Sequence, residues 1–386
     1  PDIVYAGEYM GILTRYDRST GHARLISVWP EEYSGHGAKD YKYRFQWTYP
    51  IVISPHDPRI LYVGGNHVFK SADEGEHWEP ISPDLSWNDP ATQGPSGGPI
   101  TKDNTGAEVY GTVFTLAESP KQPGLIWAGT DDGRLHVTRD GGETWTEVTP
   151  PDLPERALMS IVEPSPHDPA VAYLAATRYK FDDFRPYLYK TTDYGQTWTK
   201  ITGGIPEDDF TRVIREDPQR RGLLFAGTET GIYVSFDDGV NWQRLGGDLP
   251  AVPIHDFVIA GTDLVVATHG RSFWILDDIT LLRQVAEQHE LDGALRLFTP
   301  RETIRWGGLP AFGFAPVKGL NYAFAATQHP AYDFEKLPDG EVKIRWLDAG
   351  ANPPDGAIIH YELAAEVDEI VLEILDAGGA VLRTVK

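Results

Sequence analysis

One eight-residue pattern occurs four times in this sequence and limits what the chain can fold into. It reads S/T-x-D-x-G-x-x-W and lies at residues 71–78, 138–145, 191–198 and 235–242. The aspartate can close a turn by accepting hydrogen bonds from backbone N–H groups a few residues on. The glycine can take a positive φ, and the tryptophan suits a half-buried position between sheets. Each octet therefore predicts the turn of a β-hairpin. We expect these octet residues to be structural: Asp73, Trp78, Asp140, Trp145, Asp193, Trp198, Asp237 and Trp242.

A second pattern precedes each octet and completes a repeating unit. An apolar run, a turn with proline and another apolar run occur in order, with the prolines at Pro55, Pro120, Pro166 and Pro218. The unit is strand a, proline turn, strand b, short loop, strand c, octet turn, strand d. Four antiparallel strands in about 40–50 residues are typical of a propeller blade. The longer spacings between octets are explained by insertions at 82–108 and 178–187.

Two degenerate units flank the four complete ones, at residues 3–30 and 254–276. The sequence thus predicts an all-β fold, a β-propeller of four-stranded antiparallel blades. Six blades are recognisable, and we expect seven once further polypeptide completes the ring, because open strand edges promote association. We assign residues 1–280 to the propeller with an incomplete first blade and 281–356 to a helix and irregular linker. Residues 357–386 are assigned to the start of a truncated β-sandwich, with a hairpin around an Ala-Gly-Gly turn.

Composition excludes several classes of function. The formal net charge is -23, with 57 acidic and 34 basic residues, so we expect no nucleic-acid partner. There is no cysteine, and no apolar stretch approaches the length of a membrane helix. His-Glu-x-x-His, Gly-x-Ser-x-Gly and nucleotide-binding loops are absent, so we predict no metal and no cofactor.

The octets resemble the Asp-box, or bacterial neuraminidase repeat, superfamily, which includes sialidases, xyloglucanases and sortilin ectodomains. The segments 268–278 and 94–102 are similar to a group of large bacterial proteins described as sortilin-like or glycosyl-hydrolase-like, with two propellers and a C-terminal β-sandwich. This resemblance implies that the chain is the second propeller and the beginning of the sandwich. We expect an extracytoplasmic location, periplasmic or secreted, with any signal peptide outside this chain.

The order of strands predicts where a ligand binds. Proline turns and octet turns share one end of each blade, while b–c and d–a loops share the other, where arginines, histidines and aromatic residues converge. The insertion 178–187 is the strongest candidate because a blade does not need it and insertions often mark the binding face. The ligand-binding candidates are Arg44, Trp47, Arg178, Tyr179, Arg185, Arg212, His255, His269 and Arg271.

Each candidate also has a structural interpretation. His269 and Arg271 can tie the last blade to the ring, and the arginines as a group can neutralise neighbouring aspartates. Carboxylates at Asp132 and Glu229 can cap turns. The candidate catalytic carboxylates, if the protein is a glycosidase, are Asp132, Asp183, Glu229 and Asp256. Such enzymes place two carboxyl groups about 5–5.5 Å or 6.5–9.5 Å apart.

The leading functional hypothesis is a non-catalytic scaffold that binds a polysaccharide or protein ligand within a larger protein or complex. The alternative is a glycoside hydrolase acting on a polysaccharide, xyloglucanase-like or sialidase-like. Arg44, Arg212 and Arg271 could form a sialidase arginine cluster, but the F/Y-R-I-P motif of that family is absent.

Overall fold

The computed structural model describes the whole chain except residues 1, 32, 36, 96, 98–99, 101–105, 107, 288–292, 304–320, 323–330, 339, 341, 348, 351–355 and 386. The chain divides into two compact units, Pro1–Leu276 and Asp277–Lys386. Several residues of the motif at 94–102 lie outside the described residues, as does part of the predicted linker.

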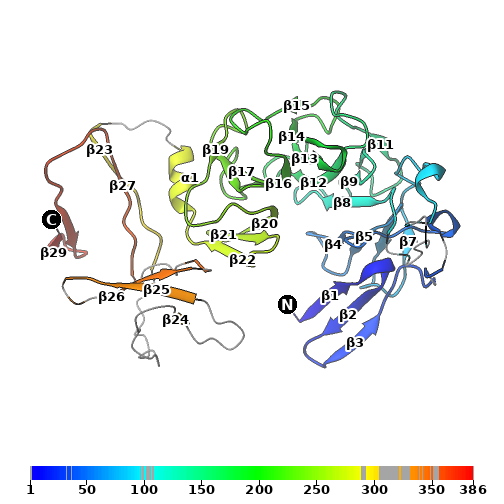
Figure 1. Ribbon diagram of the computed structural model, residues 1–386, viewed down its shortest axis with the longest axis horizontal. Helices are drawn as coiled ribbons and strands as arrows, with labels where there is room; N and C mark the ends of the chain where they lie inside the picture. Colours follow the sequence, from blue (N-terminus) through cyan, green and yellow to red (C-terminus); the bar gives the residue numbers. More distant parts are fainter. Residues whose placement is uncertain are drawn as a thin grey trace. The chain divides into compact units, whose positions relative to one another are not determined.

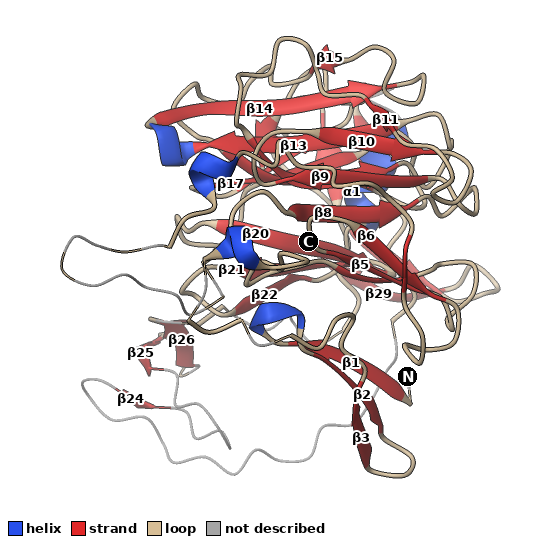
Figure 2. Ribbon diagram, turned by 90° about the vertical axis from the view of Figure 1, so that its right-hand side faces the viewer, coloured by secondary structure: helices blue, strands red, loops and turns tan. Residues whose placement is uncertain are grey.

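The first unit is a β-propeller, which confirms the predicted fold class. Six antiparallel sheets follow one another in chain order, from β1 to β22 (Figures 1 and 2). Blade 1 comprises β1 (Ile3–Gly7), β2 (Leu13–Asp17) and β3 (His22–Leu25); blade 2 comprises β4 (Ile51–Ile53), β5 (Leu61–Gly64), β6 (Val68–Ser71) and β7 (Glu79–Pro80). Blade 3 comprises β8 (Val113–Glu118), β9 (Ile126–Thr130), β10 (Leu135–Thr138) and β11 (Thr146–Glu147); blade 4 comprises β12 (Leu158–Pro164), β13 (Ala172–Arg178), β14 (Asp183–Thr191) and β15 (Thr199–Lys200). Blade 5 comprises β16 (Thr211–Glu216), β17 (Leu224–Thr228), β18 (Ile232–Ser235) and β19 (Gln243–Arg244); blade 6 comprises β20 (Ile254–Ala260), β21 (Asp263–Thr268) and β22 (Phe273–Leu276).

The core lies between the blades rather than within any one of them. Strands β9 and β17 are buried along their whole length, because a neighbouring sheet covers each face. One apolar cluster joins blades 3 and 4 around Trp127, Met159 and Tyr189. Sheets buried on both faces read as continuous apolar runs in the sequence, which is why strand b was easy to recognise.

The octet turns form as predicted. In each octet the aspartate accepts a hydrogen bond from the backbone N–H of residue seven, as from Thr144 to Asp140 at 2.9 Å. The side chain of the same residue donates to the second carboxylate oxygen, at 2.5 Å from Thr144 Oγ1 and 2.7 Å from Asn241 Nδ2. The first residue donates its hydroxyl to the aspartate and accepts the glycine N–H, as Thr138 does from Gly142 at 3.0 Å. A side-chain donor at position seven is therefore part of the motif.

The octet tryptophans join each blade to the one before it. The indole Nε1 of Trp145 donates to the carbonyl of Ile81 at 2.7 Å, and that of Trp242 donates to the carbonyl of Ile201 at 2.7 Å. Trp78 and Trp198 make the same bond to Ile26 and Val148, at 2.8 Å and 2.7 Å. The predicted position of the tryptophans between sheets is thereby confirmed.

Short 3-10 turns lie in the loops of this unit. They are η1 (Tyr9–Gly11), η2 (Ala38–Asp40), η3 (Pro90–Thr92) and η4 (Tyr179–Phe181).

The second unit contains one helix and several small sheets. Helix α1 (Thr280–Glu287) begins the segment assigned to a helix and irregular linker. That segment is less irregular than expected. A three-stranded sheet forms from β24 (Asn321–Tyr322), β25 (Ala331–Lys336) and β26 (Val342–Trp346), and β23 (Leu295–Leu297) pairs with β27 (Tyr361–Leu363). The expected C-terminal hairpin is present as β28 (Leu372–Leu375) and β29 (Val381–Val385).

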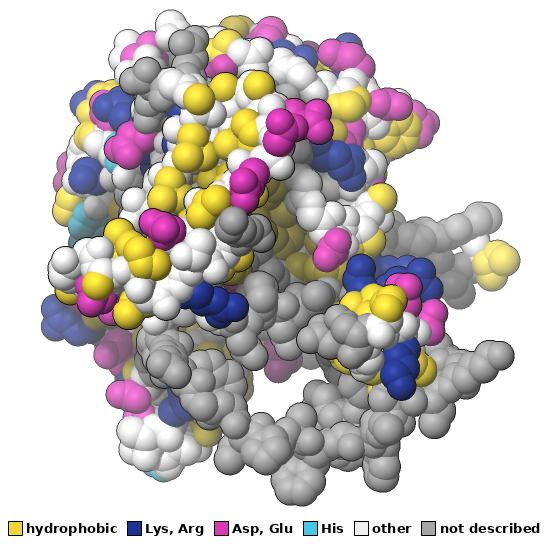
Figure 3. All heavy atoms as spheres, turned by 90° about the vertical axis from the view of Figure 1, so that its left-hand side faces the viewer, with side chains coloured by type: hydrophobic (Ala, Val, Ile, Leu, Met, Phe, Trp, Pro, Cys, Tyr) yellow, Lys and Arg dark blue, Asp and Glu magenta, His cyan; other side chains and the backbone are white. Residues whose placement is uncertain are grey.

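None of the helices in the described part of the chain has the length and apolar character needed to cross a bilayer. On the face shown in Figure 3, acidic and basic side chains are interspersed with hydrophobic and uncharged ones.

Candidate functional site

The two ends of each blade are distinguished by hydrogen bonds. Residue four of every octet donates its N–H to a carbonyl of the a–b turn in the same blade, as Tyr194 does to Ala170 and Asp238 to Gly222, both at 3.0 Å. Proline turns and octets therefore share one end, as the sequence predicts. We call the opposite end, which carries the b–c and d–a loops, the rim.

At the rim of blades 4 and 5, aromatic side chains pack around an arginine. Tyr179, in the turn η4, stacks on Phe210 with ring centroids 5.1 Å apart and an interplanar angle of 15°. Phe184 packs against Phe210 at 6.0 Å and remains 47% exposed. The guanidinium of Arg212 lies over both stacked rings, 5.1 Å from the centre of Tyr179 and 4.9 Å from that of Phe210. The insertion predicted from the sequence therefore contributes to a shared surface with the next blade.

Arg212 is also held by a carboxylate. Its Nε and Nη2 both donate to one oxygen of Glu229, Oε2, at 2.9 Å and 2.7 Å. The side chain of Glu229 is 37% exposed and that of Arg212 15% exposed. A fixed cation, aromatic rings and a solvent-accessible carboxylate thus lie together.

Strand a of blades 3 to 6 carries a β-bulge near the rim, a feature that sequence analysis missed. One extra residue separates successive pairings in each strand, and these residues are Phe114, Ser160, Arg212 and His255. Ser160 Oγ donates to the carbonyl of Arg212 at 2.5 Å, which connects two of the bulges. Bulges re-aim side chains and are common near binding sites. No local sequence signal distinguishes a bulged strand from a regular one here.

Blade 6 contributes two histidines to the rim. The rings of His255 and His269 lie 4.7 Å apart at an angle of 32°. Burial, the charge of Arg212 and the neighbouring His269 lower the pKa of His255, and Glu229 acts in the opposite direction. These electrostatic influences connect His255 with the Arg212–Glu229 pair of blade 5.

Arg271 follows in the same loop. Its backbone N–H donates to Thr268 Oγ1 at 3.2 Å, and its carbonyl accepts from Trp274 Nε1 at 2.7 Å. Among the residues that the structure describes, its guanidinium has no ion-pair partner. Its charge is therefore available at the rim.

Asp183, by contrast, is occupied by neighbouring side chains. Arg185 binds it through Nε and Nη2 at 2.9 Å and 2.8 Å, Tyr187 donates its hydroxyl at 2.8 Å, and Arg178 lies 3.6 Å away. The hydrogen bonds from Arg185 and Tyr187 lower the pKa of Asp183 against the effect of burial. Arg178 and Arg185 thus neutralise a neighbouring aspartate, which is the structural alternative to ligand binding that the sequence left open.

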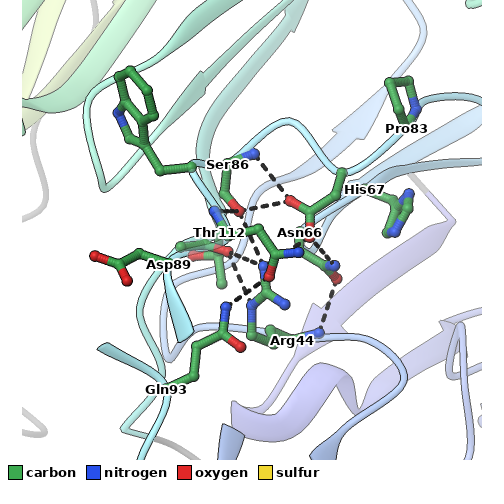
Figure 4. Close-up of polar contacts among 12 residues, drawn as sticks. Arg44, Asn66, His67, Pro83, Ser86, Asp89, Gln93 and Thr112 are labelled. Atoms are coloured by element: carbon green, nitrogen blue, oxygen red, sulfur yellow. Dashed lines mark hydrogen bonds and ion pairs between the residues drawn. The ribbon is translucent and has the colours of Figure 1, made fainter. Parts of the chain in front are cut away.

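Arg44 lies in a buried polar network between blades 2 and 3 (Figure 4). Its guanidinium donates to the carbonyl of Gly111 at 3.2 Å and 3.1 Å, to Ser86 Oγ at 3.0 Å and to Asp84 at 2.9 Å. Its backbone N–H donates to Asn66 Oδ1 at 3.0 Å. With a residue exposure of 4%, Arg44 fastens loops together rather than presenting a charge to solvent.

Asp132 belongs to the same region and is equally enclosed. It accepts from the backbone N–H of Trp87 at 2.8 Å and from Thr130 Oγ1 at 2.7 Å, and it is 2% exposed. Burial raises its pKa. This is the turn-capping arrangement that the sequence left open. Trp47 is 54% exposed; it lies 5.2 Å from Tyr9 and donates to Glu108 at 3.2 Å.

Asp256 is part of an ionic cluster that the sequence reading did not find. Arg215 bridges two innermost strands beside its own, donating to Asp256 Oδ1 at 2.8 Å and to Glu163 Oε2 at 2.7 Å. Burial raises the pKa of Glu163. The side chain of Asp256 stays 51% exposed. The two carboxylate partners of Arg215 lie on other blades, so the sequence around Arg215 does not reveal them, whereas the partner of Arg212, Glu229, lies in its own blade.

Within the described residues, no group of three or more His, Asp or Glu side chains is arranged to hold a metal ion.

Comparison with known proteins supports a glycoside-hydrolase-like propeller. No protein-family profile matches the chain. Among curated proteins, a xyloglucanase of Acetivibrio thermocellus is 27% identical over 154 residues, which is 36% of this chain and 18% of that protein. A xyloglucanase of a Paenibacillus species is 26% identical over 154 residues, which is 36% of this chain and 14% of that protein. The chain thus matches less than a fifth of the length of these relatives.

Solved structures with a similar fold include an ancestral enzyme of glycoside hydrolase family 74, at 16% identity and a TM-score of 0.44, covering 83% of this chain and 40% of that one. A structure of YCF48 bound to D1 peptide matches at 14% identity and a TM-score of 0.44, covering 72% of this chain and 76% of that one.

Proposed function

We propose that this propeller is part of a glycoside hydrolase that acts on a polysaccharide, with the rim of blades 4 to 6 as its substrate site. The observation that carries the proposal is the grouping of the Tyr179–Phe210–Arg212 stack with the exposed carboxylate of Glu229. Aromatic rings stack on the apolar faces of sugars, and fixed charged groups orient hydroxyl groups. The xyloglucanase relatives favour this function over the non-catalytic scaffold that led the sequence analysis.

Two of the four candidate carboxylates suit catalysis better than the others. Glu229 and Asp256 each have an arginine partner but keep side chains 37% and 51% exposed, whereas Asp132 is 2% exposed and the side chain of Asp183 is 11% exposed. Hydrolysis of a glycosidic bond uses a pair of carboxyl groups that face the substrate. We therefore assign the first two to the reaction and the second two to the support of loops.

The wider setting follows the resemblance noted from the sequence. We place the chain in the Asp-box superfamily, beside the sortilin-like bacterial proteins, as an extracytoplasmic propeller of a larger protein. The octets, with their repeated hydrogen bonds, support this placement.

The test measures release of reducing ends from a panel of neutral and acidic polysaccharides, xyloglucan among them, by the longest soluble form of the protein that contains this chain. We expect turnover, and we expect Glu229→Gln or Asp256→Asn to reduce it by at least about 100-fold without loss of folding. Asp168→Asn, at the octet end, is the matched control and should leave the rate unchanged. Saturable polysaccharide binding without turnover would restore the non-catalytic scaffold.

A further inference from the structure

The rim of blade 6 carries three basic side chains, one arginine and two histidines, on a protein whose formal net charge is -23 with histidine counted as neutral. His255, His269 and Arg271 come from two adjacent segments of one blade. The N–H of His269 donates to the carbonyl of Pro253 at 2.9 Å, which holds the b–c loop beside the start of strand a. Gly270, with φ of 93°, allows the turn that brings Arg271 back toward the strand.

The arrangement of His255 is specific to its bulge. The register of β20 against β21 passes from Ile254 opposite Thr268 to Asp256 opposite Ala267, so His255 is the extra residue. In a regular strand, the side chain of His255 would point to the opposite face of the sheet from the side chains of its two neighbours. The bulge breaks this alternation and changes the direction of the His255 side chain. The equivalent residue of blade 5 is Arg212, so the two innermost strands present basic side chains at matching positions.

The charged groups around this pair do not cancel it. Glu229 is bound to Arg212, and Asp256 is bound to Arg215. Both carboxylates therefore have a guanidinium partner already. What remains is the guanidinium of Arg271 and the imidazole rings of His255 and His269.

We propose that His255, His269 and Arg271 bind a carboxylate group of the ligand, so that the polysaccharide is one carrying uronic acid residues. This inference rests on the proposed function, because it names the substrate class of the same rim. Imidazolium and guanidinium groups form strong, charge-assisted hydrogen bonds to carboxylates. A carboxylate bound here therefore favours the protonated form of His255.

The direction of the pH dependence follows from the groups that face the pair. His255 has a pKa lowered from its ordinary value by burial, Arg212 and His269. Its neutral form is therefore favoured in the unliganded protein. A bound carboxylate favours the protonated form, and uronic acids themselves stay ionised down to about pH 4. Affinity for an acidic ligand thus rises as the pH falls.

Calorimetric titration of the intact chain with a galacturonic acid tetrasaccharide and with a neutral xyloglucan heptasaccharide, at two pH values, tests this. We expect the acidic probe to bind about tenfold more tightly at pH 5.5 than at pH 7.5, and the neutral probe to show less than about a twofold change. The double variant His255→Gln with His269→Gln should remove the pH dependence, and Arg271→Gln should weaken binding of the acidic probe at both pH values. His22→Gln, an exposed histidine of β3, is the matched control.

The outcomes separate the two proposals. If the neutral probe binds and the acidic probe does not, the substrate class is wrong while the glycoside-hydrolase proposal stands. Equal binding of both probes at both pH values also overturns the inference alone. If neither probe binds to folded protein, both proposals fail. Equal pH-dependent binding of a sulfated tetrasaccharide would replace the carboxylate with anions in general and overturn the uronate assignment.

Discussion

The two ends of the blades differ in how far their structure repeats from one blade to the next. At the octet end, four blades repeat the same hydrogen bonds with nearly the same lengths, from 2.7 to 2.8 Å for the four indole groups. At the rim, the equivalent loops carry a turn held by Asp132, an aromatic insertion, the Glu229 pair and the histidine pair. The repeated hydrogen bonds at the octet end maintain the fold. The loops that differ from blade to blade at the rim are where a ligand can be recognised specifically.

The largest expected effect breaks the octet end. Trp242 is 5% exposed and bonded to the preceding blade, so Trp242→Ala should lower the free energy of unfolding by about 3–5 kcal/mol through a cavity between sheets. Urea denaturation measures this. Trp47→Ala, which removes an exposed rim tryptophan, is the control and should cost far less. Equal losses from the two variants would contradict the division between the ends.

A smaller effect depends on pH and lies in the body of blade 3. Burial and the charge of Arg134 lower the pKa of His136 to about 4, and its Nδ1 has no hydrogen-bond partner in the described part of the chain. The folded state holds this imidazole neutral, so its contribution to stability is complete above about pH 6.5 and is lost as the pH falls toward 4. Between those values the loss is about 3 kcal/mol.

His136→Leu removes this titration and serves as the comparison. The difference in unfolding free energy between the wild type and the variant should shift by about that amount between pH 7 and pH 4. A constant difference would show that His136 is solvated in the fold.

Removal of an octet aspartate should have a modest effect. The octet aspartates Asp140 and Asp237 are exposed, and the backbone N–H groups that they bind lie at exposed turns. Water can replace the carboxylate at exposed donors. Asp237→Ala should therefore lower the free energy of unfolding by only about 0.5–1 kcal/mol, measured by urea denaturation. A loss as large as that from Trp242→Ala would mean that the turn, not the tryptophan, joins the blades.

The smallest effect on stability is expected at the rim. Tyr179→Ala combined with Arg185→Ala should change the thermal midpoint by about 2 °C or less, because both residues serve a loop outside the core. Polysaccharide affinity, measured on the same samples, should fall by about tenfold. Val240→Ala, an exposed octet residue, is the matched control. Reduced stability with unchanged affinity would make the insertion structural.

The sequence predicted the propeller well because its signals are local. The octet, the proline turn and the apolar strands each reveal their structure within a few residues. The surroundings of Arg44 and Asp132 were not predictable in the same way, since their partners at Gly111 and Trp87 lie 67 and 45 residues away. The role of Arg215 depends likewise on carboxylates contributed by two other blades.

The grouping at the rim was predicted in part. The order of strands correctly placed the b–c loops opposite the octets, and Tyr179, Arg212 and Glu229 do lie together. The bulges were missed because an extra residue in a strand changes neither its composition nor its ends. The assignment of ligand-binding and catalytic roles to these residues stays a prediction.

The indole bonds also give the propeller a direction. Each octet tryptophan reaches backward, so a blade offers its carbonyl acceptor before the donor that will use it has been synthesised. The carbonyl acceptor of each blade is synthesised before the tryptophan that binds it. When a later blade leaves the ribosome, the acceptor for its tryptophan is therefore already present. Folding can thus proceed during translation, with each sheet packing onto the preceding one. Truncation from the carboxyl end should leave the indole–carbonyl hydrogen bonds of the preceding blades intact.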